Sequence, residues 1–309
     1  MSVQFDEAAH TFAALRAADL ARQEAAGTVY WSKRNGIEYL LRADARRKVE
    51  TLGARSAKME AVHAALIGAR QYARDRHKQL AGNLKQQQKL NRVLRVGHVP
   101  TAWVRILNGI WRAGMEEQVT VVGAAATYAY ECAGRVRIVR AARSVEDAAV
   151  LAERCSRLQL KVSDAGAAQR MLEVIQQAVP SFQTYRDQRY LAIDPRGLEV
   201  SVQHDAAAAP QRSQMLLCGP AFVQSVAAVN GEMASMRTLA PRAFVLDRLM
   251  RSKQAERDGL ERRRDASLAQ LVMAITLERL EGSNLRHYMP QLAETKGQLW
   301  SADSMNISA

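Results

Sequence analysis

One stretch constrains this 309-residue chain more than any other, the run VTVVGAAATYAYE that begins at Val119. Its first four residues, Val119–Val122, are mostly apolar and all β-branched, and Gly123 interrupts the run. The next eight, Ala124–Glu131, are mostly good helix formers. Four apolar residues suit a buried strand better than a helix, and glycine marks a change of element. The pattern therefore predicts a strand, a glycine turn and a short helix.

The residues that follow are strongly basic and then acidic. Arg135, Arg137, Arg140 and Arg143 form a basic segment, and Glu146-Asp147 precedes a second apolar run at 149–151. Because that run is short and apolar, we expect it to be a second strand, with the acidic pair at its edge.

The chain resembles the bacterial nucleotidyltransferase-fold family of the polymerase-β superfamily in the order of these features. The order is a strand, a glycine, a helix, an arginine-bearing loop and an acidic pair at the edge of a second strand. The segment VVGAAATYAYE carries the family's V-V-G-x-x-A-x-Y-A-Y-E pattern. Four further segments match in the expected order between about residues 28 and 280, namely VYWSKRNGIEYL, LGARS, LNRVLRVGHVP and DRLMRSKQAERDGLERRRD. The resemblance implies an α+β fold with a mixed sheet and flanking helices.

The resemblance also implies a nucleotide site and a metal site. In the family the glycine, here Gly123 followed by Ala124, lets the backbone approach a triphosphate because glycine has no Cβ. Carboxylates on adjacent strands hold Mg²⁺ ions about 3.5–4 Å apart. The nucleotide-binding candidates are Gly123, Ala124, Glu146, Arg262 and Arg264, the last two lying in a basic helical region that the family places near the nucleotide cleft.

The acidic positions of the family pattern are mostly replaced. Asp147 aligns with the first acid of D-x-D and is the one catalytic and metal-binding candidate, whereas the second acid aligns with Ala149. The third, in a G-[YL]-E-V-D pattern, aligns with Ser201. Asp205 is four strand residues further on, about 13 Å away, and is a poor substitute.

Three hypotheses for function remain open. The first is an active transferase that uses a rearranged metal site and moves a nucleoside monophosphate from an NTP to an acceptor, with Mg²⁺ and NTP required. The second, which we prefer, is a degenerate relative (a pseudoenzyme) that needs no cofactor and binds nucleotide, nucleic acid or a partner. The third is a basic helical scaffold that assembles with itself or with a partner protein.

The N-terminal region is predicted to hold a helix over about residues 5–25, a hairpin and a long helix. Asn35-Gly36 between two β-rich arms is typical of a two-residue hairpin turn. Ser56 is the predicted N-cap of a helix that runs toward Arg95. Apolar residues at 59, 62, 66, 69, 73, 80 and 84 form a seam for a partner helix, within the chain or from another copy. The other faces are basic, and the nucleic-acid-binding candidates there are Arg70, Arg74, Lys78 and Lys85.

Later elements are predicted more briefly. We expect helices over about 103–113, around 173–175 and within 241–280. Strands are expected at 189–193, 198–203, 215–217 and 221–229, the first two joined as a hairpin. The expected domains are 1–100 with the hairpin and long helix, 101–235 with the core, and 236–309 with C-terminal helices.

The amino-acid composition indicates which classes of partner the chain is suited to bind. The chain has 44 Lys and Arg against 31 Asp and Glu, a net charge of +13, which favours polyanions such as nucleotides or nucleic acid. Its 3 cysteines have no metal-ligand spacing and are expected to be reduced thiols. No run of apolar residues is long enough to span a membrane, and no signal-peptide core is evident. We therefore expect a cytoplasmic protein without a membrane partner.

Overall fold

The computed structural model describes residues 3–43, 48–138, 145–162, 164–185, 188–204 and 220–280. The chain divides into two compact units. Unit 1 comprises residues 1–105 and 225–234, and unit 2 comprises residues 106–224 and 235–309. The expected α+β class is confirmed, because helices flank both a small antiparallel sheet and a larger mixed sheet.

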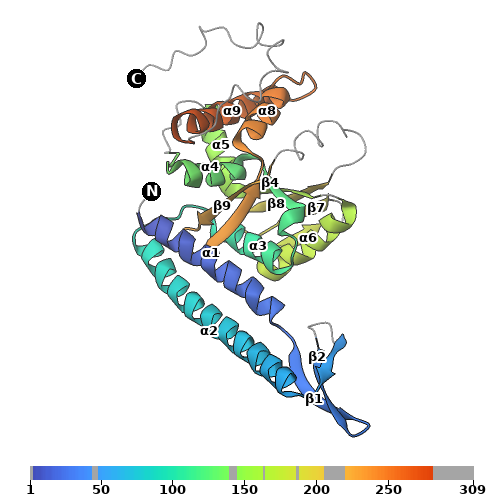
Figure 1. Ribbon diagram of the computed structural model, residues 1–309. Coiled ribbons are helices and arrows are strands. Elements are labelled where there is room, and N and C mark those ends of the chain that lie inside the picture. The colour runs from blue at the N-terminus through green and yellow to red at the C-terminus, as the bar shows by residue number, and fades with distance from the viewer. Residues whose placement is uncertain are drawn as a thin grey trace, which may run out of the picture. The chain divides into compact units, whose positions relative to one another are not determined.

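Unit 1 is built on two long helices that lie side by side, α1 (Val3–Glu24) and α2 (Ala57–Val93) (Figure 1). They run antiparallel, since Gln4 of α1 contacts Asn91 of α2 while Asp19 of α1 contacts His77. The Ser56 side chain accepts a hydrogen bond from the Met59 amide, as expected for an N-cap. The predicted seam is buried at Ala73, Leu80 and Leu84, and α1 of the same chain packs against α2.

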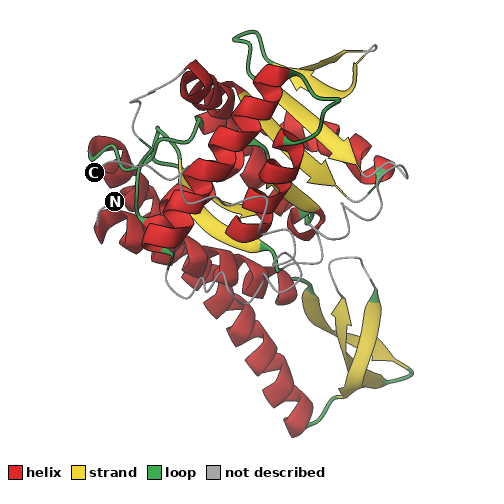
Figure 2. Cartoon of the chain, turned by 90° about the horizontal axis from the view of Figure 1, so that it is seen from above, coloured by secondary structure: helices red, strands yellow, loops and turns green. Residues whose placement is uncertain are grey.

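Between α1 and α2 the chain forms a three-stranded antiparallel sheet (Figure 2). Its strands are β1 (Thr28–Arg34), β2 (Ile37–Ala43) and β3 (Val49–Ala54). The predicted hairpin is confirmed, because Arg34 pairs with Ile37 and the turn residues Asn35 and Gly36 both have positive φ, 52° and 80°. This conformation matches the twist of the two strands. The sequence did not predict β3.

The larger sheet has seven strands in the order β6-β7-β8-β5-β4-β10-β9. They are β4 (Val119–Val122), β5 (Arg157–Val162), β6 (Gln183–Tyr185), β7 (Gln188–Ile193), β8 (Glu199–His204), β9 (Phe222–Ala227) and β10 (Met233–Thr238). Central β5 is antiparallel to β4 and parallel to β8, so the sheet is mixed. The β7–β8 hairpin and β9 confirm predicted strands, whereas 215–217 lies outside the described residues.

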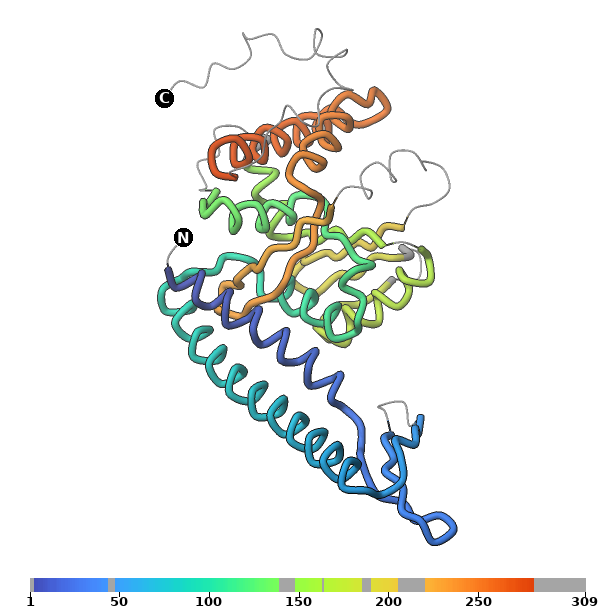
Figure 3. The backbone as a smooth tube through the Cα atoms, viewed as in Figure 1, coloured from blue at the N-terminus to red at the C-terminus, as the bar shows by residue number. Residues whose placement is uncertain are grey.

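The remaining helices follow α2 in the chain. They are α3 (Thr101–Arg112), α4 (Thr127–Gly134), α5 (Val145–Ser156), α6 (Ala165–Ala178), α8 (Pro241–Ser252) and α9 (Gly259–Arg279), with short 3₁₀ turns η1 (Glu116–Gln118) and η2 (Ala124–Ala126). Of these, α5 and α6 pack against strands of the larger sheet, while α9 packs against α4 and α5. Figure 3 shows α8 and α9 packed side by side. The predicted helices around 103–113, 173–175 and 241–280 are confirmed. Among the described residues, no helix combines the length and the apolar composition needed to cross a membrane.

One prediction was wrong, the strand at residues 149–151. These residues lie inside α5, so the backbone of Glu146 and Asp147 is helical and does not flank a strand. The next strand is β5, which begins ten residues after Asp147, at Arg157. Three apolar residues are too few to reveal a period, and the neighbouring alanines, leucine and glutamate are good helix formers.

Candidate functional site

The site begins at Gly123, the residue between β4 and η2. Its backbone has φ 77° and ψ −167°, a region that only glycine adopts without strain. A Cβ added there would lie 2.3 Å from Oε1 of Gln159. The Gln159 carboxamide therefore packs directly over the glycine backbone, from the neighbouring strand β5.

The register of the central strands brings a small set of side chains to this place. Gln159 pairs with Val122 on one side and with Ser201 of β8 on the other. Side chains along β5 alternate, with Leu158, Leu160 and Val162 buried, while Arg157 and Gln159 lie on the more exposed face. Arg157 pairs in register with Glu199, and the two side chains form an ion pair of 2.9 Å.

These residues do not fit a pair of magnesium ions. Gln159 offers a neutral amide, Ser201 offers a hydroxyl, and the Glu199 carboxylate is already paired with Arg157. Mg²⁺ is held in proteins mainly by carboxylates and phosphate oxygens, and a guanidinium on the same face repels it. Within the part of the chain that the structure describes, no three His, Cys, Asp or Glu side chains gather as metal ligands would.

The helix after Gly123 has a structural role. Glu131 of α4 is fully buried and forms an ion pair with Arg154 of α5, which is 4% exposed, and it also accepts a hydrogen bond from the Ile138 amide at 2.5 Å. The Arg154 guanidinium stacks over the Tyr128 ring, 4.0 Å from its centroid. Burial alone would lower the pKa of Arg154, but Glu131 and Tyr128 together raise it, so this arginine stays charged.

The second tyrosine of the motif anchors α4 to the end of β10. The Tyr130 hydroxyl donates to the Leu239 carbonyl at 2.8 Å, and the Thr238 hydroxyl donates to the Val121 carbonyl at 2.8 Å. Burial raises the pKa of the Tyr130 phenol above its usual value. The T-Y-A-Y-E residues therefore join α4 to its surroundings, and none of them is solvent-exposed.

The other residues predicted to bind nucleotide or metal lie in three different elements, η2, α5 and α9. Ala124 is buried in η2, next to Gly123. Glu146 and Asp147 lie at the start of α5, and their side chains are outside the described residues. Arg262 is exposed and Arg264 half-buried near the start of α9. Nearby Asp265 is buried and pairs with Arg248 of α8 at 2.6 Å, so part of this basic region holds two helices together.

Of the four nucleic-acid-binding candidates on α2, Arg70 and Arg74 line a pocket in unit 1, while Lys78 and Lys85 are exposed.

The sequence analysis did not identify Arg157 and Gln159, which lie on β5 beside β4 and Gly123. The alternation in R-L-Q-L-K-V was the signal that could have located the second strand at 157–162.

Comparison with protein families gives a match for the chain. The model of a family described as nucleotidyltransferase matches residues 101–202 and 194–293, which together make up more than half of the chain. No match was found among curated proteins or among solved structures.

Proposed function

The chain belongs to the nucleotidyltransferase family, and from this premise we propose that it is a nucleotidyltransferase-like protein that binds a phosphate-bearing ligand without transferring nucleotides. The family's chemistry moves a nucleoside monophosphate from an NTP to an acceptor with the help of Mg²⁺. Gln159 is the observation that carries the proposal, because its amide lies beside Gly123 on the strand where the chemistry needs a carboxylate.

The physical argument concerns charge in the transition state. Two divalent ions stabilise the attacking and leaving oxygens of a phosphoryl transfer, and removing that stabilisation costs several kcal/mol. The face beside Gly123 carries an amide, a hydroxyl and the Arg157–Glu199 ion pair. Amide, hydroxyl and guanidinium groups donate hydrogen bonds to phosphate oxygens without a metal. This face is therefore suited to binding a phosphate group and poorly suited to turnover.

The first test is a search for nucleotide transfer. We expect no label to reach protein, RNA or the chain itself when the protein is incubated with labelled NTPs and Mg²⁺ or Mn²⁺. Equilibrium dialysis with the same NTPs should show binding with and without the metal. Label transfer that disappears in Asp147→Ala would contradict the proposal and favour an active enzyme with a rearranged metal site.

A second experiment introduces carboxylates at the two positions beside Gly123 where this chain has an amide and a hydroxyl. The double variant Gln159→Asp with Ser201→Asp should acquire Mn²⁺ binding, detectable as loss of the free-ion signal in electron paramagnetic resonance. The matched control is Gln159→Asn with Ser201→Asn, which has the same shape and no added charge. We expect neither that control nor the unmodified protein to bind Mn²⁺. Binding by the unmodified protein would show that other carboxylates hold the metal.

A further inference from the structure

Three arginines of unit 1, one from β2 and two from α2, line one pocket. We propose that Arg42, Arg70 and Arg74 bind a phosphate group of a nucleic acid strand, and that the backbone of this strand continues along α2. The inference concerns unit 1 only and does not rest on the function proposed for the mixed sheet in unit 2.

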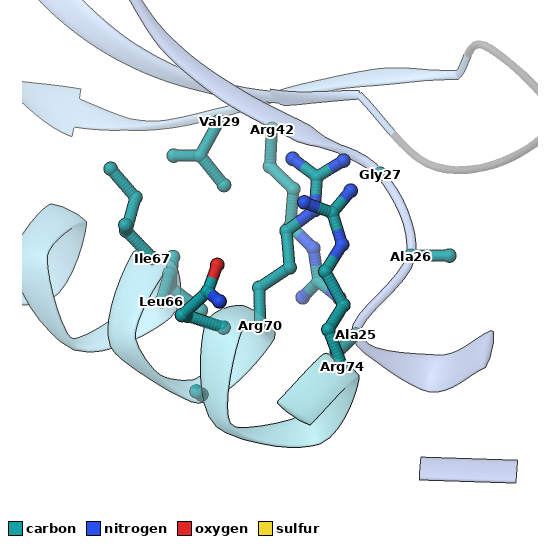
Figure 4. Close-up of a pocket in the computed structure, with 11 residues that line it drawn as sticks. Ala25, Ala26, Gly27, Val29, Arg42, Leu66, Ile67, Arg70 and Arg74 are labelled. Atoms are coloured by element: carbon teal, nitrogen blue, oxygen red, sulfur yellow. The ribbon is translucent and has the colours of Figure 1, made fainter. Parts of the chain in front are cut away.

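The pocket has a volume of about 260 Å³ and lies where β1 and β2 face α2. Figure 4 shows Arg42 extending from β2 toward α2, while Arg70 and Arg74 extend from α2 toward the strand, so that their guanidinium groups converge near Gly27. Val29 and Leu66 supply apolar lining. A phosphate with part of its sugar fits such a space, which is slightly smaller than typical small-molecule pockets.

The charges in the pocket are not balanced by the described side chains around them. No Asp or Glu is among the described residues that line it, and Arg42 donates one hydrogen bond, at 3.3 Å, to the Glu24 carbonyl at the end of α1. Arg70 and Arg74 have no ion-pair partner among the described residues. Like charges held together repel each other, so an anion that binds here relieves that repulsion. Arginine forks match the geometry of phosphate oxygens, which makes phosphate the suitable anion.

The basic surface continues from the pocket along α2. At about 100° per residue, the Lys and Arg side chains of α2 from Arg70 onward, except Arg76, fall within roughly 100° of the helix circumference and extend over about 33 Å of its axis. They are Arg70, Arg74, Lys78, Lys85, Lys89 and Arg92. The acids of α2 lie outside this arc or before it, because Asp75 is about 140° around the helix from Arg70 and Glu60 precedes Arg70 in the chain. Asp75 accepts hydrogen bonds from Gln71, and Glu60 pairs with Arg55. We call these six residues and Arg42 the basic arc.

The shape of the basic arc favours a nucleic acid over other polyanions. A nucleic acid strand presents phosphates at regular intervals along a line, and the basic arc presents cations along a straight helix. An acidic peptide offers carboxylates at irregular spacing and contains no group with the oxygen geometry of phosphate. A strand that places one phosphate in the pocket can reach the exposed lysines further along α2.

The test uses the full-length protein and a labelled 20-nucleotide single strand, with affinity measured by fluorescence anisotropy. Arg42→Gln, Arg70→Gln and Arg74→Gln should each weaken binding about tenfold, as expected for loss of a charge-assisted hydrogen bond. The matched control is Arg76→Gln, which removes the same charge from an exposed position on another side of α2. We expect this control to change affinity less than about twofold.

Further measurements test whether the ligand is a nucleic acid strand. The salt slope of the Arg70→Gln, Arg74→Gln double variant should fall by about 1.4, since each single-strand phosphate contact contributes about 0.7. Arg70→Lys with Arg74→Lys keeps the charge and loses the fork, so it should bind better than the double Gln variant and worse than the original. ATP, inorganic phosphate and a poly-glutamate peptide should compete only at concentrations far above that of unlabelled strand.

Several results would overturn the inference. Equal losses for Arg76→Gln and Arg70→Gln would mean that total charge alone determines binding. Competition by ATP or inorganic phosphate at the concentration of the strand would make the pocket a small-molecule phosphate site, and equal competition by poly-glutamate would make it a protein-binding surface. Circular dichroism of each variant confirms that the fold is retained.

Discussion

At the scale of single residues, Gly123 is constrained by its backbone and by its neighbour. The positive φ of 77° with ψ of −167° requires glycine, and the Gln159 amide occupies the space that a Cβ would enter. The same glycine is the position at which the family resemblance implies a close approach to phosphate. In this chain the side chain that covers the glycine is the neutral amide of Gln159.

Gly123→Ala should lower the free energy of unfolding of unit 2 by about 1–3 kcal/mol, the usual cost of a side chain in this backbone region. The control is Gly82→Ala in α2, where a Cβ meets nothing within 4 Å. Because alanine is the better helix former, this change should stabilise unit 1 by up to about 1 kcal/mol. Urea denaturation measures both, and equal effects would contradict the conformational argument.

At the scale of elements, α4 and α5 are joined by a buried ion pair. Glu131 and Arg154 are 0% and 4% exposed, and the Tyr128 ring covers the arginine. The pair Arg157–Glu199 joins β5 to β8 in the same unit, but its side chains are 43% and 25% exposed. The two pairs use the same residue types, so burial is the main difference between them.

Glu131→Ala should destabilise unit 2 by about 3–5 kcal/mol, because it leaves the Arg154 charge buried without a partner. Glu199→Ala removes the exposed pair and should cost no more than about 1 kcal/mol, since water solvates Arg157 in its place. Thermal or urea denaturation of the two variants gives the comparison directly. Similar losses would mean that water reaches Arg154 once Glu131 is removed.

At the scale of the whole molecule, the excess of basic residues governs behaviour at low ionic strength. The net charge of +13 makes the folded chain repel itself, and the repulsion between exposed charges is screened within about 10 Å at 0.1 M salt. The basic arc in unit 1 is one local concentration of this charge. Binding of a polyanion and screening by salt both reduce the repulsion, although only binding depends on where the charges lie.

Raising NaCl from about 20 mM to about 200 mM should therefore raise the melting temperature, because screening weakens self-repulsion more than it weakens buried ion pairs. Differential scanning calorimetry at constant pH measures the shift. Sucrose at the same osmolality is the control for effects other than screening. A melting temperature that falls with added NaCl would mean that favourable surface ion pairs outweigh the net repulsion.

Much of the local structure followed from local patterns. Asn35-Gly36 indicated the first hairpin, and Ser56 indicated the start of α2. In each case the residues that determine the conformation are neighbours in sequence, so their chemistry can be interpreted without the rest of the chain. The family pattern around Gly123 likewise identified β4 and the helix after it.

Only the tertiary structure decided which residues meet. It placed 149–151 in α5, and it set Gln159 and Ser201 beside each other through the pairing of β5 with β8. It also brought Arg42 of β2 to Arg70 and Arg74 of α2 at one pocket. These contacts join residues 28 to 42 positions apart in the chain, and contacts between residues so far apart in sequence depend on strand register and helix packing. No pattern within a short window of sequence contains that information.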